Sequence, residues 1–235
     1  MSKQVFIILF TLCLGFFPLY AFGVDYSSVH PQYNVDTTPS NLPEDIQKVL
    51  QGKVNLLILL LQDPAIIEEL IKANQKPLPS EKELYKIDQE WINSRRITPF
   101  IKSFMTNDCA KKLLAFKAQH PEFSEIFIAD IHGLNACQTD KTADYYQADE
   151  KWWSNGYNHG QGQASFTTIE FDTDTQSAAA VLYAPVMDPQ THKAIGVCKG
   201  IIDTRILGCI FASHPITRSH DTRSVIRITL DHRFA

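Results

Sequence analysis

EIFIADIHGLNACQTDKTADYYQADEKWW, residues 125–153, decides the fold class, because the apolar residues, spaced as in helices up to Pro121, begin to alternate here. Ile126 and Ile128 stand in an alternating run, a turn follows at 130–133, and a second run covers 134–139. Two alternating runs joined by a glycine-containing turn are typical of a β-hairpin. We therefore expect a sheet to begin here.

Further alternating runs follow this hairpin at Ala164–Phe171, Ser177–Pro185 and Ala194–Asp203. Turn-rich residues separate the runs, as expected for successive strands of one sheet. Near the end of the chain, Ser224–Leu230 alternates as well and is a candidate for one more strand. These runs predict an antiparallel sheet of five or six strands.

The part of the chain before the hairpin is expected to be helical. From Pro43 to Leu61 the apolar residues recur at intervals of three and four, the spacing of one helix face. Asp63 and Pro64 then supply a cap and a first-turn proline for a second helix, which should end near Asn74.

A third helix is expected to begin after Ser80 and to run to about Asn93, because Ser80 and Glu83 form a capping-box signature. Two shorter helices should follow over 99–106 and 109–119. Helices followed by antiparallel strands indicate an α+β domain, with long N-terminal helices packed on the sheet.

The first 23 residues have the composition of a secretory signal peptide: Lys3, an apolar run, Pro18 and then small residues. The run is shorter than the roughly 18 apolar residues that a membrane anchor needs. Residues 24–41 form an irregular lead-in, 42–203 the domain, and 204–235 a C-terminal extension of uncertain role. We expect a periplasmic or secreted protein that does not span the membrane after cleavage.

Composition and cysteine spacing exclude some kinds of site. Removal of Lys3 with the leader lowers the number of basic residues from 22 to 21, against 26 acidic ones, and this balance argues against a nucleic-acid partner. Four cysteines lie outside the leader, and their pairing in one or two disulfides is open. Without a C-x2-C pair, no metal site and no cofactor are expected. The four cysteines are Cys109, Cys137, Cys198 and Cys209.

The order of these elements resembles the single Cache family of extracytoplasmic sensor domains, which are relatives of PAS domains. The resemblance covers about residues 43–203. It rests on the D-x-x-G turn at Asp130, the piece TDKTADY at 139–145, the acidic pair before Trp152, and the P-V-x-D-P turn at 185–189. It implies that helices cover one face of the sheet and that a small molecule binds on the other, beneath a long loop. In this family a membrane helix and an output module usually follow the sensor domain, and the sequence shows neither. We therefore expect either that a separate signalling protein receives the signal or that binding itself is the function.

That long loop, residues 140–163, contains the candidate site. A loop of about two dozen residues in a compact domain is usually functional, and aromatic rings can wall a pocket while acids orient a ligand. A tyrosine of the fourth strand is added because the resemblance puts that strand near the pocket. The candidate ligand-binding residues are Asp144, Tyr145, Tyr146, Asp149, Trp152, Trp153 and Tyr183.

Other roles for some of these residues stay open. Asp149 could cap a short helix that begins at Glu150, and Asp144 could simply fix the loop. One of the two adjacent tryptophans is expected in the core and the other at the pocket. Arg95 and Arg96 could bind an anion, but adjacent arginines near a helix end are more often solvated.

The sequence contains no G-x-S-x-G, H-E-x-x-H, Walker or G-x-G-x-x-G motif, so we expect no enzyme. We expect a sensor domain that binds a small polar metabolite, namely an amino acid, a carboxylate or an amine. Two alternatives remain. One is a secreted protein-interaction factor that uses the same scaffold. The other is a secreted hydrolase whose catalytic residues meet only on folding.

Overall fold

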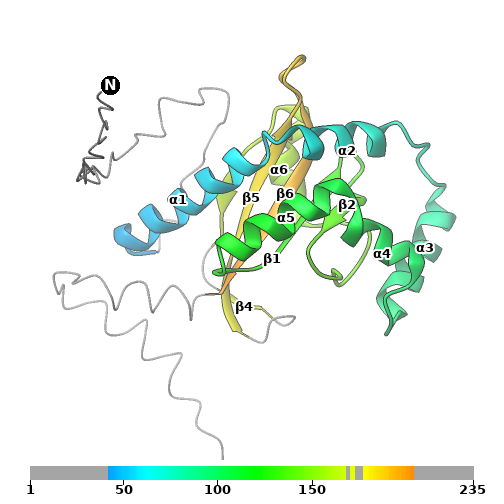
Figure 1. Cartoon of the computed structure of the whole chain (residues 1–235), viewed down its shortest axis with the longest axis horizontal. Helices are drawn as coiled ribbons and strands as arrows, with labels where there is room; N and C mark the ends of the chain where they lie inside the picture. Colours follow the sequence, from blue (N-terminus) through cyan, green and yellow to red (C-terminus); the bar gives the residue numbers. More distant parts are fainter. Residues whose placement is uncertain (1–41, 168–169, 173–176, 204–235) are drawn as a thin grey trace, which may run out of the picture. The chain divides into compact units, whose positions relative to one another are not determined.

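The structure is a computed structural model, and it describes residues 42–167, 170–172 and 177–203 (Figure 1). The expected signal peptide, the lead-in and the C-terminal extension, with Cys209 and the candidate strand at 224–230, lie outside the described residues. Within the described ranges, no helix is long and apolar enough to cross a membrane.

The helices before the sheet begin and end close to where the sequence predicts them. Asp63 accepts a hydrogen bond from the backbone N–H of Ala65, and Ser80 and Glu83 form the expected capping box. The last of these helices begins one residue early, because Asn107 caps it. The helices are α1 (Glu44–Leu60), α2 (Pro64–Asn74), α3 (Glu81–Asn93), α4 (Pro99–Thr106) and α5 (Asp108–Gln119).

The strands form one antiparallel sheet in the order β2-β1-β6-β5-β3, and β4 also pairs with β5. The expected α+β fold is thus confirmed. The single strand expected over 164–171 is present as two short pieces, β3 and β4. The strands are β1 (Phe123–Asp130), β2 (Asn135–Gln138), β3 (Ser165–Phe166), β4 (Glu170–Asp172), β5 (Ser177–Met187) and β6 (Ala194–Asp203).

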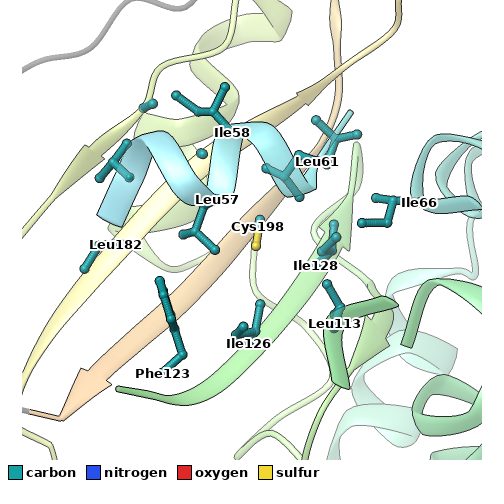
Figure 2. Packing of buried hydrophobic residues seen from close by; sticks show 14 of the residues in the cluster. Leu57, Ile58, Leu61, Ile66, Leu113, Phe123, Ile126, Ile128, Leu182 and Cys198 are labelled. Carbon is teal, nitrogen blue, oxygen red and sulfur yellow. The ribbon is translucent and has the colours of Figure 1, made fainter. Parts of the chain in front are cut away.

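The inner face of the sheet packs against α1, α2 and α5 and forms the main hydrophobic core. Leu57 of α1 is fully buried with Ile126 and Ile128 of β1 and Leu182 of β5 (Figure 2). Burial of each such side chain contributes about 1.5–3 kcal/mol. Because alternate residues of a strand point to opposite faces, Phe127 points to the outer face.

The outer face is covered by α6 (Lys151–Tyr157), a short helix within the loop that follows β2. Its Gly156 lies so close to β6 that an added Cβ would come within 2.5 Å of Val197 Cγ1. Glycine at this position therefore lets the helix backbone rest directly on the sheet.

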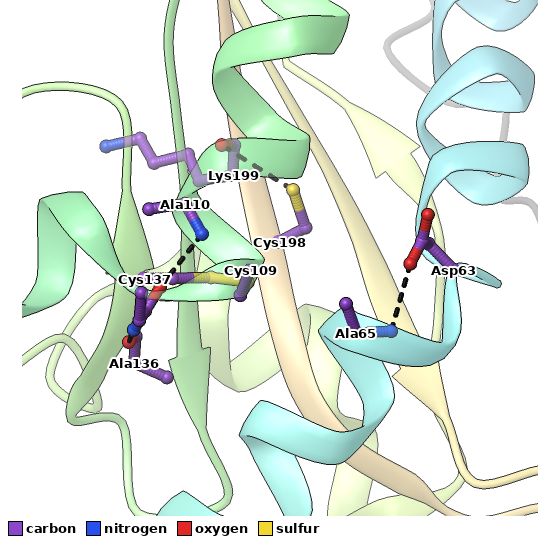
Figure 3. Close-up of a disulfide and its surroundings, with 9 residues drawn as sticks. Asp63, Ala65, Cys109, Ala110, Ala136, Cys137, Cys198 and Lys199 are labelled. Atoms are coloured by element: carbon purple, nitrogen blue, oxygen red, sulfur yellow. Dashed lines mark hydrogen bonds between the residues drawn. A yellow bond between two sulfur atoms is a disulfide. The ribbon is translucent and has the colours of Figure 1, made fainter.

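A disulfide joins Cys109 of α5 to Cys137 of β2 (Figure 3). This bond is one of the pairings that the sequence leaves open. Cys198 is buried on the inner face without a disulfide partner, and burial raises the pKa of its thiol. Among the residues that the structure describes, no cluster of His, Cys, Asp and Glu could hold a metal ion.

Candidate functional site

The turn after β1 is fixed by the carboxylate of Asp130. This carboxylate accepts hydrogen bonds from the backbone N–H groups of His132 (2.8 Å) and Leu134 (2.9 Å). Gly133 supplies the left-handed residue of the turn, with φ 75°. The carbonyl oxygen of Gly133 accepts a hydrogen bond from the N–H of Gln147, which holds the long loop against the turn.

Tyr145 and Tyr146 do not lie on the outer face of the sheet. Tyr145 packs in a second hydrophobic cluster with Trp91 of α3 and Phe104 of α4, and Tyr146 borders this cluster. The backbone N–H groups of both tyrosines donate to Asp88 Oδ1 of α3, at 2.8 and 3.1 Å. Burial raises the pKa of Tyr145 to about 12. These two tyrosines attach the loop to α3.

Asp144 is half-buried beside the same attachment. Its carboxylate accepts a short hydrogen bond from the side-chain amide of Gln147. Burial, followed by the negative charge of Asp88, raises its pKa to about 6. Its carbonyl oxygen accepts hydrogen bonds from the side chains of Thr142 and Asn135. These contacts agree with the role of fixing the loop.

Asp149 is exposed and does not cap α6. The residue at the N-cap position is Glu150, whose side chain makes no capping hydrogen bond, and the helix begins at Lys151. Sequence reasoning placed this helix start one residue too early. Arg95 and Arg96 are exposed in the connection between α3 and α4, as expected for solvated side chains.

The remaining candidates meet on the outer face. The ring of Trp152 lies edge-on to Phe127, with centroids 5.4 Å apart, in a cluster that includes Tyr183. Trp152 and Tyr183 are only 6% and 7% exposed. Trp153 is half-buried, stacks on Tyr157, and donates its indole N–H to the carbonyl oxygen of Asp130 (3.1 Å). Trp152 is therefore the more deeply buried of the two tryptophans.

Strand pairing places five residues in one row across this face. Directly paired residues point to the same side of an antiparallel sheet. Phe127 of β1 pairs with Gln138 of β2 and with Lys199 of β6, and Lys199 pairs with Tyr183 of β5, which pairs with Ser165 of β3. We call these five residues the outer row.

Two polar residues in this part of the molecule were missed by sequence reasoning. Gln138 and Lys199 belong to strands that were predicted, but neither was considered as a site residue. The signal in the sequence is a polar side chain in a short apolar strand, such as the single lysine in AIGVCKGIID at 194–203. Which of these side chains meet follows only from the register of the strands.

Several polar atoms near the outer row lack partners in the described structure. Both amide atoms of Gln138, which is fully buried, and the indole N–H of Trp152 have no hydrogen-bond partner. The ammonium of Lys199 lies 5.5 Å from the ring centre of Phe127 and 5.4 Å from that of Trp152. An apolar wall with a few unpaired polar atoms can hold a small polar ligand.

Comparisons with known proteins found similarity among solved structures. No protein-family model and no curated protein matches the chain. One similar structure is the ligand-binding domain of the Pseudomonas fluorescens chemoreceptor CtaA with L-valine (TM-score 0.42, 14% identity, 72% of this chain and 59% of that chain). Another is the sensory domain of the Campylobacter jejuni chemoreceptor Tlp3 with isoleucine (TM-score 0.36, 15% identity, 72% and 65%).

A third is the ligand-binding domain of the Pseudomonas aeruginosa PAO1 amino acid chemoreceptor PctC with GABA (TM-score 0.40, 14% identity, 72% and 59%). This chain thus spans less than two thirds of the length of each of these domains.

Proposed function

We propose that this protein is an exported sensor domain that binds a small polar metabolite on the outer face of its sheet, beneath α6, without chemical conversion. A separate signalling protein would receive the signal. In this proposal Trp152 and Tyr183 contact the ligand, and Trp153 holds α6 in place through Asp130. The hydrogen bonds of Asp144 to neighbouring side chains, and those of Tyr145 and Tyr146 to Asp88 of α3, support a role in fixing the loop. Asp149 is exposed and has no ligand role in this proposal.

The unpaired polar atoms of Gln138 and Trp152 are the observation that carries this proposal. A buried polar group without a hydrogen-bond partner costs about 1–3 kcal/mol. Each such group calls for a partner, and a bound molecule such as a ligand or a water can supply it. Here they adjoin the rings of Phe127 and Tyr183, so a ligand would find apolar contact and hydrogen bonds in one place.

The test is a thermal-shift screen of the protein, expressed from its full sequence into an oxidising compartment. The panel contains amino acids, carboxylates, amines and purines, because a ligand of the folded state raises the melting temperature by mass action. We expect a saturable shift with at least one compound. The shift should disappear in W152A and persist in Y85A, which changes an aromatic side chain that is 68% exposed on α3. A folded protein that responds to no compound would disprove small-molecule sensing.

A second candidate function, a protein-interaction factor, is favoured by a different observation. The surface of α3 and its flanking segments exposes several large apolar side chains, and two surface hollows lie along this helix. Exposed apolar groups that lie on neighbouring segments of a chain can mark an interaction surface. The exposed residues are Leu78 (53%), Tyr85 (68%), Ile92 (45%), Ile97 (49%) and Phe100 (47%).

Cross-linking of the exported protein in its host tests this second function. A discrete adduct that is lost in the double variant Y85S/I92S and retained in W152A would favour an interaction factor. Absence of any adduct would count against it. The described cysteines do not support the hydrolase alternative, because none of them is an accessible nucleophile. Cys109 and Cys137 are bonded to each other, and Cys198 is buried.

A further inference from the structure

We propose that residues 224–230 of the C-terminal extension dock on the exposed face of α3. The surface that the second candidate function would give to a partner protein then has an occupant within the same chain. This docking involves neither a ligand nor the outer face of the sheet, so it does not depend on small-molecule binding.

The exposed face of α3 carries an apolar stripe. Tyr85 and Ile92 are seven residues apart, which is about two helical turns, so they lie on one side of the helix. Both side chains are exposed, as is that of Leu78 just before the helix, and no segment of the described structure covers them. We call these three residues the α3 stripe.

The opposite side of α3 is held by the domain itself. Trp91 is buried with Phe104 and Tyr145, and Leu84 packs against the same cluster. The helix therefore keeps its place without help from the extension. The α3 stripe is a preformed surface, and a segment that docks there does not have to build it first.

The charge around the α3 stripe favours a basic occupant. Helix α3 carries four acidic and two basic side chains. Of these acids, Glu83 and Glu90 line both of the surface hollows along the helix. Lys86 lies 3.8 Å from Glu90, but both side chains are exposed, and an ion pair of this kind contributes little. The acids therefore remain available to another cation.

The C-terminal extension has the complementary charge. Residues 204–235 contain five arginines, no lysine and two aspartates, so they are net basic, whereas α3 is net acidic. Opposite charges on two surfaces favour their association and oppose wrong partners.

The stretch SVIRITL at 224–230 adds apolar side chains to this charge. In an extended chain alternate residues point to opposite sides, so Ile226, Ile228 and Leu230 would share one side. They would span about 13 Å, and the two helical residues of the α3 stripe are about 10 Å apart along the helix axis. The apolar side thus matches the stripe in length. Arg227, on the other side, is long enough to reach an acid beside the stripe.

The extension is also long enough to reach α3. It follows Asp203, and Ile202 pairs with Phe123 at the start of β1, whereas α3 packs near Leu134, beyond the other end of this strand. The eight residues of β1 cover roughly 25 Å, and the diameter of a helix adds about 10 Å. Residues 204–223 can span up to roughly 65 Å, so the segment reaches the stripe without full extension.

A tethered segment has an advantage over a second copy of the chain. Two copies of this face would bring net acidic helices together, and like charges oppose association. Attachment to the same chain also raises the effective concentration of the segment, into the millimolar range for short flexible linkers. A contact too weak to join two proteins can therefore form within one chain.

Photocrosslinking in the exported protein, expressed from its full sequence, tests this docking. The photoreactive amino acid p-benzoyl-L-phenylalanine replaces Tyr85 in one sample. In the control it replaces Leu114, an exposed apolar residue of α5. After irradiation the products are digested and mapped by mass spectrometry. We expect position 85 to crosslink to residues 224–230 of the same chain and position 114 not to do so.

Variants of the extension then test each side of the segment. I226S/I228S removes two apolar side chains and should lower the crosslink yield at least about threefold. The matched control V225S/T229A changes the opposite side and should keep the yield within about twofold. R223E/R227E reverses two charges, so it should lower the yield more at low salt than at high salt.

The outcomes separate this docking from the other functions. An intramolecular crosslink that falls in I226S/I228S and persists in V225S/T229A supports it. A crosslink that joins two copies, one that reaches only another protein, no crosslink from position 85, or a yield unchanged in I226S/I228S would each overturn it. None of these results affects the sensor proposal, because the α3 stripe lies outside the cluster of Trp152 and Tyr183. Thermal shifts with metabolites should be the same in I226S/I228S and wild type.

Discussion

Asp144 is the described acid whose ionisation should most oppose folding. Its pKa is raised from 3.8 to about 6 by burial and by the charge of Asp88. The folded state therefore binds the proton more tightly than the unfolded state, and this stabilisation is complete below the unfolded pKa and lost as pH rises through the folded pKa. We expect D144N to be more stable relative to wild type at about pH 8 than at about pH 5, by roughly 1 kcal/mol after solvent screening.

Urea unfolding at the two pH values measures this difference. E68Q is the control, because it neutralises an exposed acid of α2 outside this loop. The stability of D144N relative to wild type should differ more between the two pH values than that of E68Q. A stability difference between D144N and wild type that is the same at both pH values would show that ionisation of Asp144 does not oppose folding.

The buried ion pair between Lys53 of α1 and Glu122 should have the opposite pH dependence. Their N and O atoms lie 2.6 Å apart, and the Glu122 side chain is 7% exposed. Burial alone would raise the pKa of Glu122, but the hydrogen bond from Lys53 and a backbone hydrogen bond outweigh it and lower the pKa below 4.5. The stability from this pair is thus present above about pH 4.5 and lost as pH falls through the folded pKa.

Removal of one partner tests this pair. K53M leaves a buried carboxylate without its cation and should cost about 2–4 kcal/mol at neutral pH. The double variant K53M/E122Q should recover part of the loss, because no unpaired charge remains. Urea unfolding of both variants provides the measurement. Equal stability of the single and the double variant would contradict the prediction.

At the scale of elements, helix boundaries were the most predictable feature, because the signals that set them are local. Asp63 and Ser80 cap their helices through residues no more than three positions away. The break between β3 and β4 and the start of α6 were not predicted, because they depend on pairing with β5 and on packing against the sheet. A local pattern carries no information about such contacts.

The disulfide fastens α5 to the edge strand β2. Cys109 and Cys137 are 28 residues apart in sequence, and a cross-link across a loop of this length stabilises a fold by roughly 3–4 kcal/mol. We expect C109S/C137S to lose about this much. Melting curves with and without reductant should show a fall for the wild type and no further fall for the variant. A wild-type melting temperature unaffected by complete reduction would contradict this.

At the scale of the whole molecule, the candidate site was predicted only in part. Tyr145 and Trp152 are close in sequence, yet one packs against α3 and the other against the outer face of the sheet. The long loop thus places residues that are close in sequence in two different hydrophobic clusters. Gln138 and Lys199, far apart in sequence, share one row through strand register, which a single sequence does not reveal.

The separation of the main core from the cluster around Trp91 also predicts which helix unfolds locally at lower free energy. Helix α1 packs into the main core, whereas α3 is held by the smaller cluster around Trp91, which is 2% exposed and donates its indole N–H to the carbonyl oxygen of Thr142. Regions with fewer buried contacts open at lower free energy. Amides of α3 should therefore exchange with deuterium faster than those of α1, and W91A should speed exchange in α3 more than in α1.

The size of this effect follows from the burial of Trp91. Truncation of a buried tryptophan costs about 3–5 kcal/mol, and the loss should fall on the contacts that hold α3 to Tyr145 and the long loop. Y85A, an exposed change on the same helix, should leave exchange in α3 nearly unchanged. If W91A accelerated exchange equally in α1, α3 and β1, the two clusters would open as one unit. Selective opening of α3 would instead show that the loop attachment can release while the sheet and its outer row stay folded.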